Sequence, residues 1–116
     1  MAKPDAAISL RQMLDYSREV MGMMQGQVRA DLDTDRKLNL ALVRLLEILG
    51  EAANRVPSSD RAKYPQIPWP QLVSLRNRLI HGYDHVDFDI LWQIVTRDLP
   101  TLTQELEEIV SALGPS

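Results

Sequence analysis

The chain has 116 residues, of which 45% are hydrophobic and 25% are charged, and its formal net charge is −3 at pH 7. This composition is that of a folded globular protein, so we expect a single domain over residues 1–116 that could bury further surface against a partner. A sequence pI near 5.3 argues against broad nonspecific binding to nucleic acids, which needs Lys and Arg along many phosphates, but leaves room for a local site.

The sequence contains no cysteine, which excludes disulfides, thiolate metal ligands and a cysteine nucleophile and suits a reducing interior. The first residues, MAKPDAAIS, lack the apolar core of a signal peptide, and no apolar run approaches the roughly 20 residues of a membrane span. We therefore expect a cytoplasmic protein without a membrane segment. Its two histidines have no third ligand at a suitable spacing, so neither a metal site nor another cofactor is predicted.

A first amphipathic helix is predicted from about Ile8 to Ala30. Gly22 and Gly26 weaken it, because glycine disfavours a helix interior. Its apolar residues recur at spacings of three, four and seven, which places them on one buried stripe: Leu10, Met13, Leu14, Met21, Met24 and Val28.

A second helix follows the acidic run DLDTD, in which Asp33 or Thr34 can cap its first turn by accepting a hydrogen bond from a backbone N–H. The helix should end by Val56, because Pro57 disfavours the helical conformation at the residue before it. Its apolar arc is wide enough to be buried on two sides. Residues that widen this arc are Leu40, Val43, Leu46 and Ile48.

Residues 57–70 hold four of the seven prolines and predict a loop with one helical turn after Ser59. Pro70 fits the first turn of a third helix, where its missing N–H costs nothing. That helix is expected to run to Gly82, a suitable C-terminal stop. Leucines at core spacing mark its buried face: Leu72, Leu75 and Leu79.

Asp87 can cap the last long segment, which keeps the helical period to its end. Pro100 lies inside this segment, so we expect a kink there or a break into two stacked helices. No stretch alternates with period two over the length of a strand, so no sheet is expected. The predicted fold is all-α, a four- or five-helix up-and-down bundle whose last helix is kinked or broken near Pro100.

The segment RNRLIHGYDH, residues 76–85, gathers cations and a tyrosine in an acidic protein. On a continuous helix, Asn77 and His81 lie one turn apart, and Arg76 and Tyr83 nearly share a face. Arginine offers a planar fork of donors that matches phosphate oxygens, and histidine exchanges a proton near neutral pH. The segment therefore combines groups suited to phosphodiester chemistry.

Each of these features also has a structural interpretation. Arg76, Arg78 and His81 could simply stabilise a helix C-terminus through its dipole, by roughly 0.3–1 kcal/mol each. Arg78 is interpreted as a solvated or structural cation, and the DH pair at residues 84–85 as a polar turn. The neighbouring acids of the second helix are interpreted as a hydrated face: Glu47 and Glu51.

The segment contains an R-x4-H-x-Y pattern, formed by Arg76, His81 and Tyr83, with Asn77 directly after the arginine. This pattern resembles the motif of the HepT-like branch of the HEPN superfamily. LLEILGEAANRVP resembles that family's GEA-containing second helix. IPWPQLVSLRNRLIHGY and DFDILWQIVTRDLPTL resemble its third helix and the one after it. The likeness covers roughly two thirds of the chain in the same order, whereas the N-terminal helix agrees only in length and amphipathic character.

The resemblance implies a HEPN-type bundle and the toxin of a HepT/MntA (type VII) toxin–antitoxin pair, a homodimeric, metal-independent endoribonuclease that acts on RNA and not DNA. In that family the motif's arginine and histidine from two subunits meet in a cleft at the dimer interface, which gives Arg76 and His81 as catalytic residues. His81 would exchange a proton and Arg76 would hold the phosphoryl oxygens. Asn77 would position the substrate.

The resemblance gives Tyr83 a separate role. A cognate MNT-type nucleotidyltransferase antitoxin would transfer AMP to Tyr83, and the added phosphate would occupy the Arg76 fork that RNA needs. Two alternatives remain open. The chain could be a noncatalytic subunit that presents Tyr83 or a nucleotide pocket to a nucleotidyltransferase, or a plain helical dimer whose polar patch only caps helices.

Overall fold

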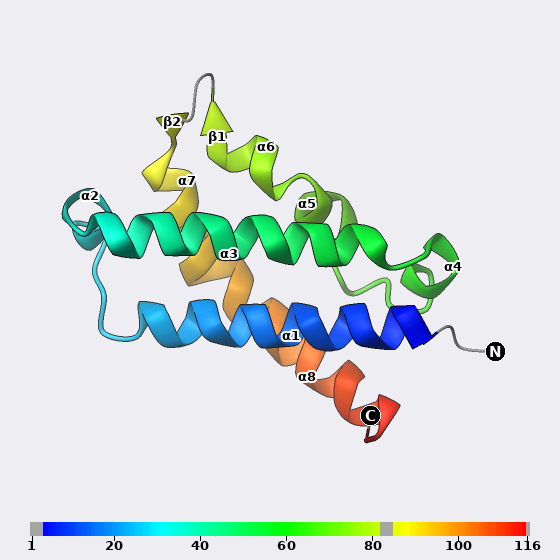
Figure 1. The fold of residues 1–116 in the computed structure, drawn as a ribbon. Coiled ribbons are helices and arrows are strands. Elements are labelled where there is room, and N and C mark those ends of the chain that lie inside the picture. The colour runs from blue at the N-terminus through cyan, green and yellow to red at the C-terminus, as the bar shows by residue number, and fades with distance from the viewer. Residues whose placement is uncertain (1–3, 82–84, 116) are drawn as a thin grey trace.

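The computed structural model describes residues 4–81 and 85–115 as a mostly helical assembly (Figure 1). The long helices α1 and α3 run antiparallel side by side, α8 crosses α1, and α5 and α6 pack on α3. In chain order the elements are α1 (Pro4–Met24), α2 (Asp31–Thr34), α3 (Arg36–Arg55), α4 (Ser58–Arg61), α5 (Trp69–Val73), α6 (Leu75–Leu79), β1 (Ile80–His81), β2 (His85–Val86), α7 (Phe88–Gln93), the π-helical turn η1 (Ile94–Asp98) and α8 (Leu99–Leu113).

Helix α1 buries the first part of the predicted stripe, leaves Met21 and Met24 half-buried, and ends at Met24, before the predicted Ala30. Gly26 follows with a φ of 78°, a left-handed conformation that favours glycine and terminates helices. Val28 was predicted to lie on the buried stripe, and this is wrong, because it follows the helix end and is 59% exposed. Leu10 and Met13 are buried as predicted.

Helix α3 begins later than predicted, because the acidic run forms the short helix α2 first. The N-cap is Asp35 rather than Asp33 or Thr34, and its carboxylate accepts a hydrogen bond from the backbone N–H of Leu38 at 3.0 Å. Asp33 instead pairs with Arg29 at 3.1 Å. The prediction that a residue of the acidic run caps this helix was therefore correct, but the capping residue lies further along the chain than predicted.

The body and end of α3 agree with the prediction. The helix ends at Arg55, and Val56 is extended before Pro57. It contacts α1 on one side and α5 and α6 on another, as expected for a helix buried on two sides, and Leu46 is fully buried. Leu40, however, remains 52% exposed, so one part of the predicted apolar arc faces solvent.

The proline-rich loop is fixed by its aromatic end. It contains the single helical turn that was predicted, now α4, and Pro70 lies in the first turn of α5 as predicted. The Trp69 indole N–H donates to the carbonyl of Tyr64 at 3.1 Å, and its ring is buried. The Arg61 guanidinium lies 5.8 Å from the ring centroid, within the range of a cation–π contact. The start of α5 is thus held in place.

The predicted third helix is not continuous to Gly82. The backbone leaves helical geometry at Ser74 (φ −96°, ψ 12°), whose hydroxyl donates back to the carbonyl of Pro70 at 2.8 Å, a contact that bends helices. The helix then ends at Leu79. Gly82 lies outside the described residues.

Two short strands follow α6, so the expectation of no sheet was wrong. Strands β1 and β2 pair antiparallel, with His81 opposite His85, and the N–H of Asp87 donates to the carbonyl of Leu79 at 2.9 Å. Each strand has two residues, which is too short to produce a recognisable alternation of apolar and polar residues.

The C-terminal half confirms both sequence predictions made for it. The Asp87 carboxylate caps α7 by accepting from the N–H groups of Asp89 and Ile90 at 3.0 and 3.1 Å. Near Pro100 the helix is interrupted by η1 before α8 begins. Pro100 has no backbone N–H to donate a hydrogen bond to the preceding turn, and a π turn is one way in which a helix accommodates the missing hydrogen bond.

Arg29 joins α2 to the start of α7. Its guanidinium contacts Asp89 at 2.9 Å and Asp33 at 3.1 Å, and these hydrogen bonds, that with Asp89 foremost, raise the pKa of Arg29. Because the pairs are exposed, they add little to stability. No helix in the described ranges is long and apolar enough to cross a membrane.

Candidate functional site

Arg76 and Asn77 point outward because their helical neighbours point inward. Leu75 and Leu79, four residues apart on α6, are at most 2% exposed, and this fixes the rotation of the helix about its axis. Arg76 and Asn77 therefore lie on the exposed face, and the Arg76 side chain is 69% exposed. The two residues are available to a ligand, as the motif requires.

His81 is also exposed, but it lies on β1 and not on the helix. The predicted stacking of Asn77 and His81 on successive turns of one helix is therefore wrong, because α6 ends at Leu79. Tyr83, the expected modification site, and the predicted helical relation between it and Arg76 lie outside the described residues.

His85 is placed directly across from His81 by the register of the two strands. Opposite residues of an antiparallel pair project from the same face, with Cβ atoms roughly 4.5–5.5 Å apart. Both histidines are exposed. Sequence reasoning assigned His85 to a polar turn, and the structure places it on strand β2 as a second imidazole on the face that carries His81.

A cleft of about 230 Å³ lies beside the motif, between the outer face of α3 and the α5–α6 segment. One wall comes from α3 and the other from α5 and α6. The lining residues are Glu47, Gly50, Glu51, Asn54, Val73, Arg76 and Asn77. Two of the four predicted site residues, Arg76 and Asn77, thus share one cavity.

Glu47 is the residue of this cleft that sequence reasoning missed. Its carboxylate oxygen lies 3.5 Å from Nε of Arg76, and its side chain is only 23% exposed. The interpretation of both helix acids as a hydrated face is therefore wrong for Glu47, although Glu51 is exposed. No spacing rule could have found this pair, because the two residues belong to elements far apart in the chain.

Gly50 explains how α3 approaches the motif. A Cβ atom at this position would lie 2.7 Å from the carbonyl oxygen of Leu72, closer than Cβ atoms approach other heavy atoms in folded proteins. Only glycine lets the backbones of α3 and α5 touch here. This contact places Glu47, one turn before Gly50, beside Arg76, one turn after Leu72.

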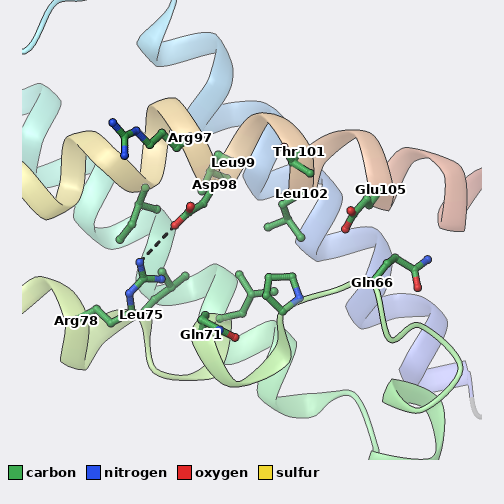
Figure 2. A pocket seen from close by; sticks show the side chains of 13 residues that line it. Gln66, Gln71, Leu75, Arg78, Arg97, Asp98, Leu99, Thr101, Leu102 and Glu105 are labelled. Carbon is green, nitrogen blue, oxygen red and sulfur yellow. Dashed lines mark hydrogen bonds and ion pairs between the residues drawn. The ribbon is translucent and has the colours of Figure 1, made fainter.

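A larger cavity, of about 430 Å³, lies between the α5–α6 segment and the η1–α8 segment (Figure 2). Leu75 and Leu102 belong to its apolar lining, and Arg78 pairs with Asp98 across it at 3.3 Å. Arg78 is thus a structural cation, as interpreted from the sequence. Among the described residues no histidine lines this cavity, so they give it no group that exchanges protons near neutral pH.

Within residues 4–81 and 85–115, no group of three or more His, Asp or Glu side chains is placed to hold a metal ion. The arrangement that remains is an exposed guanidinium beside an amide in a small cleft, with two imidazoles on the adjoining hairpin. Such groups can bind a phosphate and transfer protons.

Known proteins match the chain over nearly its whole length. A family model described as "Ribonuclease HepT-like" matches residues 13–109. A relative from Methanocaldococcus jannaschii, whose name carries a provisional RNase assignment, is 33% identical over 110 residues, which cover 95% of this chain and 91% of the relative. "Probable ribonuclease HepT" from Thermococcus cleftensis is 32% identical over 105 residues, covering 90% of this chain and 89% of that protein. No solved structure matches the chain.

Proposed function

The chain belongs to the HepT-like ribonuclease family, and we propose that it is a metal-independent endoribonuclease that acts as the toxin of a type VII toxin–antitoxin pair. The observation that supports this most directly is the exposure of Arg76 in a cleft, on the helix that leads directly into the strand that carries His81. RNA can be cut without a metal when its own 2′-OH attacks the adjacent phosphate. The protein then needs only to transfer protons and to stabilise the added negative charge.

The chemical roles follow from the side chains. An imidazole takes the proton of the 2′-OH as its oxygen bonds to phosphorus, and an imidazolium returns a proton to the 5′-oxygen as the P–O bond breaks. The Arg76 guanidinium donates to the nonbridging phosphoryl oxygens, whose charge grows in the transition state. Asn77, in the same cleft, positions the phosphate or ribose.

We further propose that the working enzyme is a homodimer in which His81 of each subunit supplies one of the two imidazoles. Exposed apolar side chains support a partner on this face. Val73 is 38% exposed and lines the cleft, and Leu40 is 52% exposed on α3, seven residues before Glu47 and so on nearly the same side of the helix. A second chain related by a twofold axis at this face would cover them and bring its own Arg76 and His81 to the same place.

Control of this nuclease would fall to an MNT-type nucleotidyltransferase that transfers AMP to Tyr83. Tyr83 is two residues beyond His81 in the sequence, so a phosphate attached there could reach the guanidinium that the RNA phosphate needs. The sequence position and the family support this proposal.

The first experiment expresses the chain alone and assays the purified protein on RNA in EDTA. We expect growth arrest and cleavage, both lost in Arg76→Ala and His81→Ala while the circular dichroism spectrum and melting temperature are kept. A folded wild-type protein that neither cuts RNA nor arrests growth would overturn the nuclease proposal in favour of a noncatalytic binding subunit.

A mixing experiment tests the shared site. Wild-type subunits and inactive His81→Ala subunits are unfolded together in equal amounts and refolded, so that mixed dimers form. If the site needs His81 of both subunits, each mixed dimer has only one of the two imidazoles and is inactive, so the total activity falls below that of the wild-type chains present. If each chain carries its own complete site, the activity stays proportional to the amount of wild-type chain.

A further inference from the structure

Arg76 needs something to hold its guanidinium in place. It projects from a helix of five residues and is 69% exposed, so its side chain would otherwise sample many rotamers. A guanidinium that stabilises a transition state must already be oriented when charge develops. The question is which group in the fold provides that orientation.

Glu47 has the position and the rigidity for this task. Its carboxylate lies 3.5 Å from Nε of Arg76, and within the described residues this is the ion pair in which Arg76 takes part. Glu47 is 23% exposed where Arg76 is 69% exposed. The acid is therefore the more restricted partner, and the arginine adjusts to it.

The backbone under Glu47 is also fixed. Helix α3 has 20 residues, and the close approach of Gly50 to the Leu72 carbonyl sets the distance between α3 and α5. Ala52 and Ala53, just beyond Gly50, are fully buried. Glu47 thus stands on a part of α3 that is held by close packing.

The position at which Glu47 contacts the guanidinium of Arg76 determines which of its nitrogens remain free to bind a phosphate. The pairing uses Nε, at the inner end of the group. The edge formed by the two terminal nitrogens remains free, and it can bind two phosphoryl oxygens in a bidentate contact. A carboxylate at Nε can hold the plane of the guanidinium while that outer edge meets the phosphate.

We propose that Glu47 is a positioning residue that orients Arg76 for the phosphoryl group through this Nε contact. The inference rests on the proposed function, since it is the phosphate contact of Arg76 that Glu47 would prepare. Glu47 itself does not touch the substrate, because an anionic side chain gains nothing from a phosphate.

The kinetic test is Glu47→Gln, which keeps the shape of the side chain and removes its charge. Because a negative charge is lost near an anionic substrate, RNA should bind as well or better, so KM stays level or falls. Because Arg76 is no longer oriented, kcat should fall by roughly ten- to a hundredfold, since a misplacement of about 1 Å can cost about a hundredfold. Glu51→Gln removes the same charge from the same cleft and isolates the electrostatic effect on KM.

A control far from the cleft is Glu107→Gln, which breaks the exposed 3.1 Å pair with Arg18. It should leave kcat and KM unchanged. If Glu47→Gln retains the wild-type kcat while the wild-type enzyme cuts RNA, the positioning role is overturned and the nuclease proposal stands.

A second readout does not depend on activity. The Nε–H of Arg76, assigned in ¹⁵N NMR spectra by its loss in Arg76→Lys, should show a high heteronuclear NOE in the wild type. This value should drop in Glu47→Gln and stay in Glu51→Gln. An Arg76 signal that is equally mobile in all three proteins would overturn the inference even if RNA cleavage fails for other reasons, and an ordered signal in a protein without nuclease activity would overturn only the proposed function.

Discussion

Helices α1 and α3 and the segment from α5 to β2 are built in opposite ways. The two long helices bury regular stripes, with Leu10, Met13 and Leu46 almost completely inaccessible. The segment from α5 to β2 consists of elements of two to five residues, and it presents Arg76 and His81 to solvent. The long helices provide a stable frame, and the short elements carry the chemistry on it.

Two contacts between these regions position the candidate site. Gly50 sets the distance between α3 and α5, and Glu47 links α3 to Arg76. Substitutions in the frame should therefore change the free energy of unfolding and leave the chemistry alone. Substitutions in the short segment should do the reverse, and those at the junction should change both.

The largest effect on stability is expected in the frame. Leu46→Ala removes a fully buried side chain from α3 and should lower the free energy of unfolding by about 2–5 kcal/mol, measured by urea denaturation. Cleavage per folded molecule should be unchanged at a temperature where the variant remains folded.

Asn77→Ala is the matched change in the short segment. The side chain is exposed, so the free energy of unfolding should stay within about 0.5 kcal/mol of the wild type, while kcat/KM for RNA should fall. Loss of stability without loss of cleavage would mean that Asn77 belongs to the frame, and the division between the two regions would fail.

The junction can be tested with two glycine-to-alanine substitutions that should change the free energy of unfolding in opposite directions. Gly50→Ala would place a Cβ atom 2.7 Å from the Leu72 carbonyl, so α5 must move, at a cost of about 1–3 kcal/mol, and Arg76 moves with it. We expect thermal melts to show the destabilisation and RNA assays a parallel loss of kcat.

Gly22→Ala is the control, because Gly22 lies within α1 and a Cβ atom added there would meet no neighbouring element within 4 Å. Removing a glycine from a helix interior should stabilise the protein by up to about 1 kcal/mol without changing cleavage. Equal melting temperatures for the two alanine variants would show that the α3–α5 contact is not tight.

The same division explains how much could be predicted from the sequence. The long helices, the cap at Asp87 and the interruption near Pro100 depend on periodicity or on single residues with strong local preferences. Those signals are complete within a few residues of the chain, so the sequence is sufficient to predict them. The end of α1 at Met24, just before Gly26, depends on a local signal too, but a weak one against a predicted stripe that continues to Val28.

The motif region was less predictable because its geometry depends on contacts between distant residues. The break at Ser74 and the end of α6 at Leu79 accompany packing on α3 and a hairpin closed by Asp87. The pair of Glu47 with Arg76 joins two elements that no spacing rule connects. Residue types therefore indicated the chemistry, while the arrangement of the groups required the fold.

His85 offers the finest test of how the short segment works, and the smallest expected effect. It lies opposite His81 in the same hairpin, so one chain presents two imidazoles, whereas the proposed mechanism takes its second imidazole from the other subunit. Under that mechanism His85→Gln should leave kcat and both limbs of its pH dependence unchanged. The matched change His81→Gln should abolish cleavage.

The opposite outcome would be informative in a specific way. If His85→Gln removes one limb of the bell-shaped pH profile, the hairpin itself supplies both acid and base, and the dimer is needed for binding alone. Mixed dimers of wild-type and His81→Ala subunits would then keep the activity of their wild-type chains, because each such chain has its own acid and base. The two experiments must therefore agree, since each shows by an independent route whether the second imidazole comes from the other subunit.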